Sequence, residues 1–236
     1  MEPMKVSRVI YVVLAVVTFL LALSSFRYFV SEFHSFQGKR YERFWESSGK
    51  ISSTAQWERA MWQMERALDY NDRNPATLLR SARVLEWYIF TPTPDGQVIR
   101  TNLDAAAVAI DRALMLRPDD GSALSARAQL KARRWQIDQS LSADIISSYQ
   151  LAPWERPVLR RLVYAAMAAW PKLDSRGRDL LVSLFMQSAE HRPLWALDIL
   201  LIASDYGHLN DLCDRLSGLD FKDKGSVRDK QCPRMD

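Results

Sequence analysis

A chain of 236 residues, of which 48% are apolar and only 8 are glycine, is long enough for one or two folded domains and is rich in helix formers. Its 32 basic and 28 acidic residues are spread fairly evenly and leave a formal net charge of +4. Nucleic-acid binding usually requires a denser basic stripe, so we expect no nucleic-acid partner, whereas an anionic lipid or polymer remains open.

The first element expected along the chain is a transmembrane helix over residues 9–28. The 18 residues from Val9 to Phe26 contain no charged side chain, and at about 1.5 Å per residue they nearly cross a hydrocarbon core. Lys5 and Arg8 precede the segment, which is typical of an N-terminus on the cytoplasmic side. We therefore expect residues 1–8 to form a cytoplasmic tail.

A cleaved signal peptide is the alternative, because Ala22-Leu23-Ser24 would serve as a small-residue cleavage site. The apolar segment is longer than the core of most signal peptides, and aromatic residues continue past it, which favours a retained anchor. We expect a single-pass protein of the bacterial inner membrane with its C-terminal domain in the periplasm. Residues 29–53 mix aromatic and charged side chains and are expected to form a helical stalk or linker.

Beyond this stalk, two segments of the chain repeat one pattern. Residues 64–76 and 110–122 each contain an Ala-Leu pair at the end of an apolar helix face, then a polar turn and the start of another helix. The first of these helices is expected to begin at Thr54, a plausible N-cap, and to end near Asp69.

Ala60, Met64 and Ala67, followed by a turn and Pro75, resemble the second helix of a tetratricopeptide repeat, in which small residues let neighbouring helices cross closely. The resemblance covers residues 54–217. It implies an all-α protein whose membrane helix is followed by a tetratricopeptide-like α-solenoid of about four helix pairs. Such stacks bind partners rather than transform substrates.

The spacing of the matching small residues indicates one insertion in this series. Ala67 and Ala113 lie 46 residues apart, against 34 for the motif. We expect the excess in a loop that starts at Thr91–Gln97, where two prolines and a glycine oppose regular helix. Ala113 and Ser148 are 35 residues apart, so the register then holds. A looser fourth pair and a short final pair follow, and residues 218–236 are expected to be a polar tail.

The sequence contains no pattern typical of an enzyme, a cofactor site or a metal site. His34, His191 and His208 are scattered, and there is no glycine-rich phosphate loop. We therefore expect no catalytic activity, no cofactor and no bound metal. Cys213 and Cys232 would close a disulfide in an oxidising compartment, and the alternative is one buried cysteine and one exposed cysteine.

The inner face of the solenoid is the candidate binding site, because the first helix of each pair lines the groove in such stacks. Counting from each helix start places six residues there: Arg83, Trp87, Gln129, Arg133, Arg160 and Tyr164. Arginine beside aromatic rings suits carboxylate, phosphate or sugar ligands. The alternative is that the arginines only solvate an exposed face and that Trp87 packs in the core.

A second resemblance bears on function. The stretches Leu151-Ala152-Pro153-Trp154, Trp170-Pro171 and Arg192-Pro193 are similar to repeat modules of bacterial exopolysaccharide and O-antigen assembly proteins. This similarity implies a non-enzymatic, membrane-anchored adaptor that holds protein partners in an envelope complex for surface-polysaccharide biosynthesis. The alternatives are a module that binds an anionic polysaccharide or another anionic ligand directly, and an assembly factor for cytochrome maturation or secretion.

Overall fold

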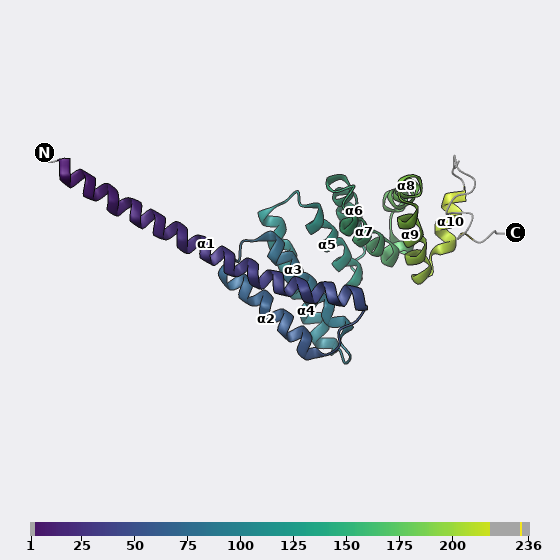
Figure 1. Cartoon of the computed structure of the whole chain (residues 1–236). Coiled ribbons are helices and arrows are strands. Elements are labelled where there is room, and N and C mark those ends of the chain that lie inside the picture. The colour runs from purple at the N-terminus through teal and green to yellow at the C-terminus, as the bar shows by residue number, and fades with distance from the viewer. Residues whose placement is uncertain (1–2, 218–231, 233–236) are drawn as a thin grey trace. The chain divides into compact units, whose positions relative to one another are not determined.

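The structure is a computed structural model that describes residues 3–217 and Cys232 (Figure 1). The described residues form ten α-helices and two short 3-10 helices and contain no strand, which confirms the all-α prediction. The α-helices are α1 (Pro3–Ser48), α2 (Thr54–Tyr70), α3 (Pro75–Trp87), α4 (Gly96–Leu116), α5 (Gly121–Arg133), α6 (Gln139–Leu151), α7 (Arg156–Ala169), α8 (Ser175–His191), α9 (Pro193–Asp205) and α10 (Leu209–Ser217). The 3-10 helices are Tyr88–Phe90 and Trp170–Lys172.

Contacts divide the chain into two compact units, Met1–Leu116 and Arg117–Asp236. The sequence predicted one solenoid over residues 54–217 instead. We call these parts unit 1 and unit 2 and describe each by itself.

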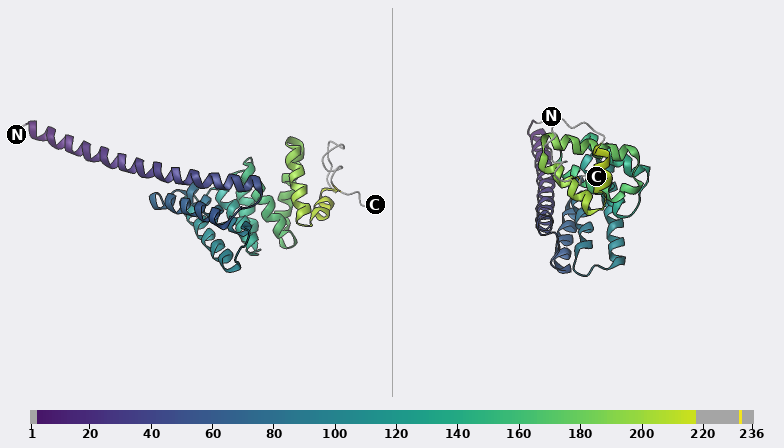
Figure 2. Two further views of the ribbon diagram at one scale, coloured as in Figure 1. Left: turned by 60° about the horizontal axis from the view of Figure 1, so that its bottom comes forward. Right: turned by 90° about the vertical axis from the view of Figure 1, so that its right-hand side faces the viewer.

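Between Ile10 and Phe26, α1 carries no charged side chain. Its large side chains are exposed from Ile10 to Phe29, with Phe19 at 68% and Leu21 at 64%. An 18-residue window of this helix has a mean hydropathy of 2.1, and none of that window is buried. Figure 2 shows the first half of α1 extending beyond the other helices of unit 1. By its length and composition, α1 is a candidate membrane span, in keeping with the anchor expected over residues 9–28.

The second half of α1 packs within unit 1. The buried Ser31 hydroxyl donates a hydrogen bond to the Ala67 carbonyl at 2.8 Å, and Trp45 is completely buried. Figure 1 shows α2 running alongside this half of α1. Trp45 belongs to a buried cluster with Ile51, Ala60, Met64, Val84 and Trp87. Residues 29–48 of the segment expected as a stalk thus supply the first helix of a pair, α1–α2, and residues 49–53 connect the two helices.

Side-chain caps set the starts of the next two helices. The Ser53 hydroxyl accepts a hydrogen bond from the Gln56 amide at 3.3 Å, so Ser53 is the N-cap of α2, one residue before the predicted Thr54. The Asn74 side chain caps α3, and Pro75 occupies the first helical position, where its missing N–H costs little.

The insertion expected between the first two motifs is mostly helix. The Asp95 carboxylate accepts hydrogen bonds from the amides of Val98 at 3.0 Å and Gln97 at 2.7 Å, which starts α4 at Gly96. These two backbone hydrogen bonds hold the pKa of the Asp95 carboxyl below its usual value, and the one from Val98 has the larger effect. Since α4 is 21 residues long, the extra residues lengthen this helix, and the loop is confined to residues 91–95.

Unit 2 contains three helix pairs, α5–α6, α7–α8 and α9–α10. Each first helix packs on its own partner, and α7 packs on both α5 and α9, so the first helices of successive pairs adjoin. Together with α1–α2 and α3–α4, the described residues form five pairs, against about four predicted. The core of unit 2 includes the completely or almost completely buried Leu141, Ile145, Leu162, Met167, Phe185 and Ile199.

A glycine allows α5 and α6 to meet closely. A Cβ at Gly121 would lie 2.8 Å from the Ala152 Cβ and 3.2 Å from the Ser148 carbonyl oxygen. The Ser148 hydroxyl donates to the Gly121 carbonyl at 2.6 Å. A small residue at each of these positions is therefore needed for the contact, which accounts for serine at the place where the motif has alanine.

A disulfide joins Cys213 of α10 to Cys232, with 5.7 Å between the two Cα atoms. Cys213 is buried in the core of unit 2, and Cys232 packs against that core. The rest of the predicted polar tail, residues 218–231 and 233–236, lies outside the described residues.

Candidate functional site

The six residues predicted to line one groove fall into the two units. Arg83 and Trp87 belong to α3 in unit 1. Gln129, Arg133, Arg160 and Tyr164 belong to α5 and α7 in unit 2.

Arg83 and Trp87 hold α3 against α1. The Arg83 guanidinium lies 3.6 Å from the Glu42 carboxylate and 3.8 Å from the carboxylates of Glu46 and Glu86, and only 17% of its side chain is exposed. Trp87 is 7% exposed, and its ring lies 5.8 Å from that of Trp45. Trp87 therefore packs in the core, as in the alternative that the sequence left open, and neither residue lines an open groove.

The unit 2 residues come together with one more tyrosine. The Arg160 guanidinium lies over the ring of Tyr164, 5.6 Å from its centre. The rings of Tyr164 and Tyr206 meet edge to face at 6.4 Å. Gln129 is only 6% exposed, so it does not line an open surface. We call Arg133, Arg160, Tyr164 and Tyr206 the Arg–Tyr cluster.

The electrostatics of Tyr206 connect the cluster to the end of α5. Partial burial raises the pKa of the Tyr206 phenol above its usual value, and the positive charge of Arg133 opposes that shift. The neighbouring Tyr164 and Asp205 add to the rise. At neutral pH the phenol is therefore uncharged and can both donate and accept a hydrogen bond. The sequence count stopped at α7 and missed Tyr206, which follows α9, the next first helix.

An exposed tryptophan follows the cluster's arginine in α5. Trp135 lies two residues after Arg133, and 75% of it is exposed. Its φ angle is 55°, a left-handed conformation that residues other than glycine rarely adopt. Such strain is common at binding sites. The Arg–Tyr cluster thus offers guanidinium groups and phenols, and an exposed indole follows two residues after Arg133; these groups suit carboxylate, phosphate or sugar ligands.

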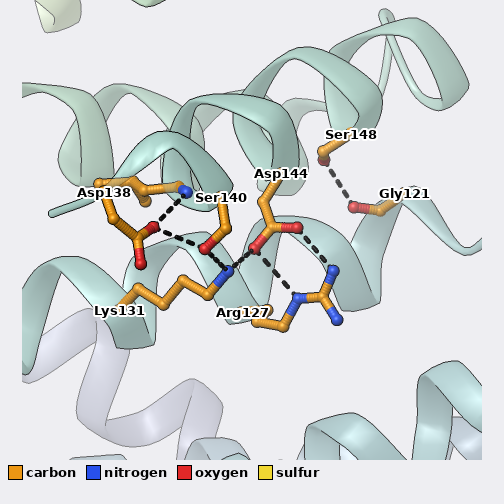
Figure 3. A network of polar contacts seen from close by, with 8 residues as sticks. Gly121, Arg127, Lys131, Asp138, Ser140, Asp144 and Ser148 are labelled. Carbon is orange, nitrogen blue, oxygen red and sulfur yellow. Dashed lines mark hydrogen bonds and ion pairs between the residues drawn. The ribbon is translucent and has the colours of Figure 1, made fainter. Parts of the chain in front are cut away.

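A second polar group in unit 2, between α5 and α6, is closed on itself (Figure 3). The Asp144 carboxylate accepts hydrogen bonds from Arg127 at 2.6 and 3.0 Å and from Lys131 at 2.6 Å. Lys131 also donates to the Ser140 hydroxyl at 2.8 Å, which donates to Asp138 at 2.6 Å. The Ser140 hydroxyl lowers the pKa of the Asp138 carboxyl. Because each charge faces a partner, this network holds two helices together and offers no reactive group.

A small hollow in unit 2 is lined by residues from two of the stretches that resemble exopolysaccharide assembly proteins. Pro153 and Trp154 line it together with Arg192 and Trp195. Its room is close to that of one water molecule, which excludes a sugar ring. The Trp195 indole N–H is buried without a hydrogen-bond partner among the described residues.

The three histidines each have a different partner. His34 contacts Gln63 in unit 1, His191 lies beside Glu190, and His208 stacks on a tryptophan. Among residues 3–217 and Cys232, no group of three or more histidine, cysteine or acidic residues could hold a metal ion. No protein-family model, curated protein or solved structure matches the chain.

Proposed function

We propose that this chain is a membrane-anchored adaptor that binds a protein partner in a bacterial envelope complex for exopolysaccharide or other surface-polysaccharide biosynthesis. The observation that carries the proposal is the stacking of α5, α7 and α9, which brings the Arg–Tyr cluster together from successive helix pairs. Stacked helix pairs of the tetratricopeptide kind bind partners through their first helices. The candidate span in α1 would hold this surface at a membrane.

The Arg–Tyr cluster favours a partner that presents carboxylates. Arginine and tyrosine are common among the residues that dominate binding energy at protein interfaces. The Arg160 guanidinium lies above the Tyr164 ring and forms no ion pair with a carboxylate of the described residues, so its N–H donors are available to a partner. The carboxylate of an acidic side chain on a partner could therefore accept two parallel hydrogen bonds from the Arg160 guanidinium.

The proposed orientation has the N-terminus in the cytoplasm, and it places unit 2 and the part of unit 1 that follows the candidate span in the periplasm. Lys5 and Arg8 precede the apolar segment, but Arg27, Lys39, Arg40 and Arg43 follow it, so charge alone does not set the orientation. A short N-terminal tail before a large domain usually stays in the cytoplasm, and this supports the proposed orientation. The Cys213–Cys232 disulfide supports an oxidising compartment for unit 2, because cytosolic thiols are kept reduced.

Two reporter fusions after Asp236 test this orientation. Alkaline phosphatase is active only when exported, and green fluorescent protein sent through the general secretion route fluoresces only in the cytoplasm. We expect the phosphatase fusion to be active and the fluorescent fusion to be dark. The opposite pair of results would contradict the orientation. Alkylation of intact cells with a membrane-permeant thiol reagent provides a second readout. We expect no label at Cys213 or Cys232, because a disulfide leaves no free thiol, and a label at either cysteine would contradict the oxidising compartment.

Charge reversal at Arg160 tests the binding function. The full chain, solubilised in detergent from its native envelope, should retain a polysaccharide synthase or polymerase on affinity capture. Arg160→Glu should lower that yield about tenfold or more, because it places a carboxylate where an acidic partner would bind. Arg176→Glu makes the same charge change at an exposed position on α8 and should leave the yield unchanged.

The outcomes of this capture separate the alternatives. Equal yields for wild type and Arg160→Glu would exclude the Arg–Tyr cluster as the partner site. Recovery of cytochrome-maturation or secretion components instead would favour an assembly factor. Direct polysaccharide binding is tested with a uronic-acid polymer as the probe, and calorimetric binding by the full chain that disappears in Arg160→Glu would favour that function.

A further inference from the structure

α1 continues without a break from its exposed apolar half into its packed half. Phe29 is 66% exposed, whereas Ser31 is completely buried against unit 1. A hydrocarbon core about 30 Å thick takes about 20 helical residues, which brings a span that starts at Ile10 to its end near Phe29. If α1 crosses a membrane, the first residues that pack on α2 and α3 therefore lie at the level of the lipid headgroups.

The end of α2 lies at this same level. The hydrogen bond from Ser31 to the Ala67 carbonyl sets Ala67 beside the start of the packed half, and Asn74 donates to Glu32 at 2.6 Å. α2 continues past Ala67 for three residues, so Tyr70 lies about 4–5 Å nearer the apolar half of α1. Figure 1 shows α2 ending beside α1 on the side of that apolar half.

Four rings from α1 and α2 are in contact at this end of unit 1. The ring of His34 lies 5.6 Å from Phe33, 5.6 Å from Trp62 and 6.3 Å from Tyr70. Phe33, Trp62 and Tyr70 are 51%, 48% and 36% exposed. We call these four residues the ring cluster. Tryptophan and tyrosine are enriched at membrane interfaces, where one part of the ring is in apolar surroundings and the other is wet.

The end of α4 adds two apolar side chains to the same end of unit 1. Arg112 donates to the Asp72 carbonyl and carboxylate, both at 3.2 Å, which brings the last turn of α4 beside the α2–α3 turn. Met115 and Leu116 follow, and they are 75% and 43% exposed. Exposed apolar groups of α1, α2 and α4 thus lie at this one end of unit 1.

Charges at this end are nearly balanced. Arg66 lies over the Trp62 ring at 5.7 Å and pairs with Asp69 at 3.3 Å. Arg112 pairs with Asp72 in the same way. The rings and apolar side chains, rather than a net positive charge, are therefore the groups that favour the lipid interface here, and anionic lipid is not required.

We propose that this end of unit 1 is docked on the membrane surface, with the ring cluster and the α2–α3 turn in the headgroup layer. The proposal rests on the membrane-anchored function proposed above, since α1 must cross the bilayer. Docking fixes the first helix pair to the membrane. It therefore limits how far from the membrane surface unit 1 can contact a partner.

Site-directed labelling of the full chain tests the docking. The chain's two cysteines are joined in a disulfide, so an introduced cysteine is the only free thiol. A fluorophore is attached at Arg73→Cys in the α2–α3 turn, or at Val98→Cys near the opposite end of α4, about 27 Å along that helix from Leu116. The protein is placed in nanodiscs of phosphatidylcholine alone, and quenching by aqueous iodide is measured.

We expect the Arg73→Cys label to be quenched roughly threefold less than the Val98→Cys label, because headgroups shield the turn. Adding Trp62→Ser and Tyr70→Ser should remove that protection. Equal quenching at the two positions in the otherwise unchanged chain would overturn the docking.

A label at Leu14→Cys separates this outcome from failure of the anchor. Lipids brominated on their acyl chains should quench that label strongly if α1 spans the bilayer. Quenching at Leu14→Cys without shielding at Arg73→Cys would overturn the docking and leave the anchored function standing. No lipid quenching at Leu14→Cys would overturn both.

Discussion

Replacing Trp45 by alanine is expected to lower the free energy of unfolding of unit 1 by about 4 kcal/mol. Trp45 is completely buried where α1 meets α2 and α3. Its ring lies 5.8 Å from that of Trp87, and its indole N–H donates to the Gln56 side chain at 3.2 Å. Alanine would leave a large cavity at this junction and would remove one of the two hydrogen bonds that the Gln56 side-chain oxygen accepts, the other coming from the Ser52 amide at 3.3 Å.

Hydrogen exchange measured by mass spectrometry on the full chain resolves this loss by unit. The amides of α2 and α3 should exchange faster in Trp45→Ala, whereas those of α7 and α8 should not change. Phe44→Ala is the matched control, because Phe44 is the neighbouring residue on α1 and is 51% exposed. Unchanged exchange in α2 and α3 of Trp45→Ala would mean that α1 acts only as a tether, as the sequence predicted.

The packing of the second half of α1 could not be predicted from the sequence. Ser31 and Ser35 are polar residues that a hydropathy pattern assigns to solvent, yet both are buried because their hydroxyls have partners on α2 and α3. Gly38 leaves space for the Met64 side chain, which a Cβ there would strike. Contacts of this kind depend on the partner helix and leave no periodic signal in the chain itself.

Because α1 was not recognised as the first helix of a pair, Arg83 and Trp87 were predicted to line a groove. The helix count treated the α3 face that carries Arg83 and Trp87 as open. With α1 as the first helix of an earlier pair, this face is covered by Trp45 and by the carboxylates of Glu42 and Glu46. On α7 the same count identified Arg160 and Tyr164 correctly as neighbours, because the helical spacing of four places them one turn apart.

The helix starts show what local sequence does determine. Asn74 before Pro75, and Asp138 before α6, are capping residues whose side chains bond the first free amides. The same chemistry at Asp95 starts α4 at Gly96, although two prolines and a glycine in that stretch favoured a longer loop. The cap contributes about 1 kcal/mol, which is as much as a glycine costs in a helix interior, and Gly96 is only the first residue of α4, so it does not prevent the helix from starting there.

Replacing Asp144 by asparagine is expected to lower the free energy of unfolding of unit 2 by about 3 kcal/mol. The Asp144 side chain is 6% exposed and accepts hydrogen bonds from Arg127 and Lys131, which are 33% and 19% exposed. Asparagine keeps the shape but removes the charge and turns an N–H₂ group toward two cations. The partial exposure of Arg127 lets water offset part of the loss, so the estimate lies at the lower end for a broken buried pair.

Asp179→Asn provides the comparison for that loss. Asp179 is 68% exposed and faces Arg215 at 3.5 Å, so its neutralisation should change the free energy of unfolding by less than about 1 kcal/mol. The α5 and α6 amides should exchange faster in Asp144→Asn and not in Asp179→Asn. Equal behaviour of the two variants would mean that the network does not hold α5 to α6.

The Asp144 variant also separates folding from binding in unit 2. α5 carries Arg133 and packs on α7, which carries Arg160 and Tyr164. Loosening α5 should therefore weaken partner capture together with protection of the helix amides. Arg160→Glu should weaken capture while leaving that protection intact, because Arg160 is exposed and its ring contact with Tyr164 is a small part of the core energy. Loss of protection in Arg160→Glu would assign the Arg–Tyr cluster to stability rather than to recognition.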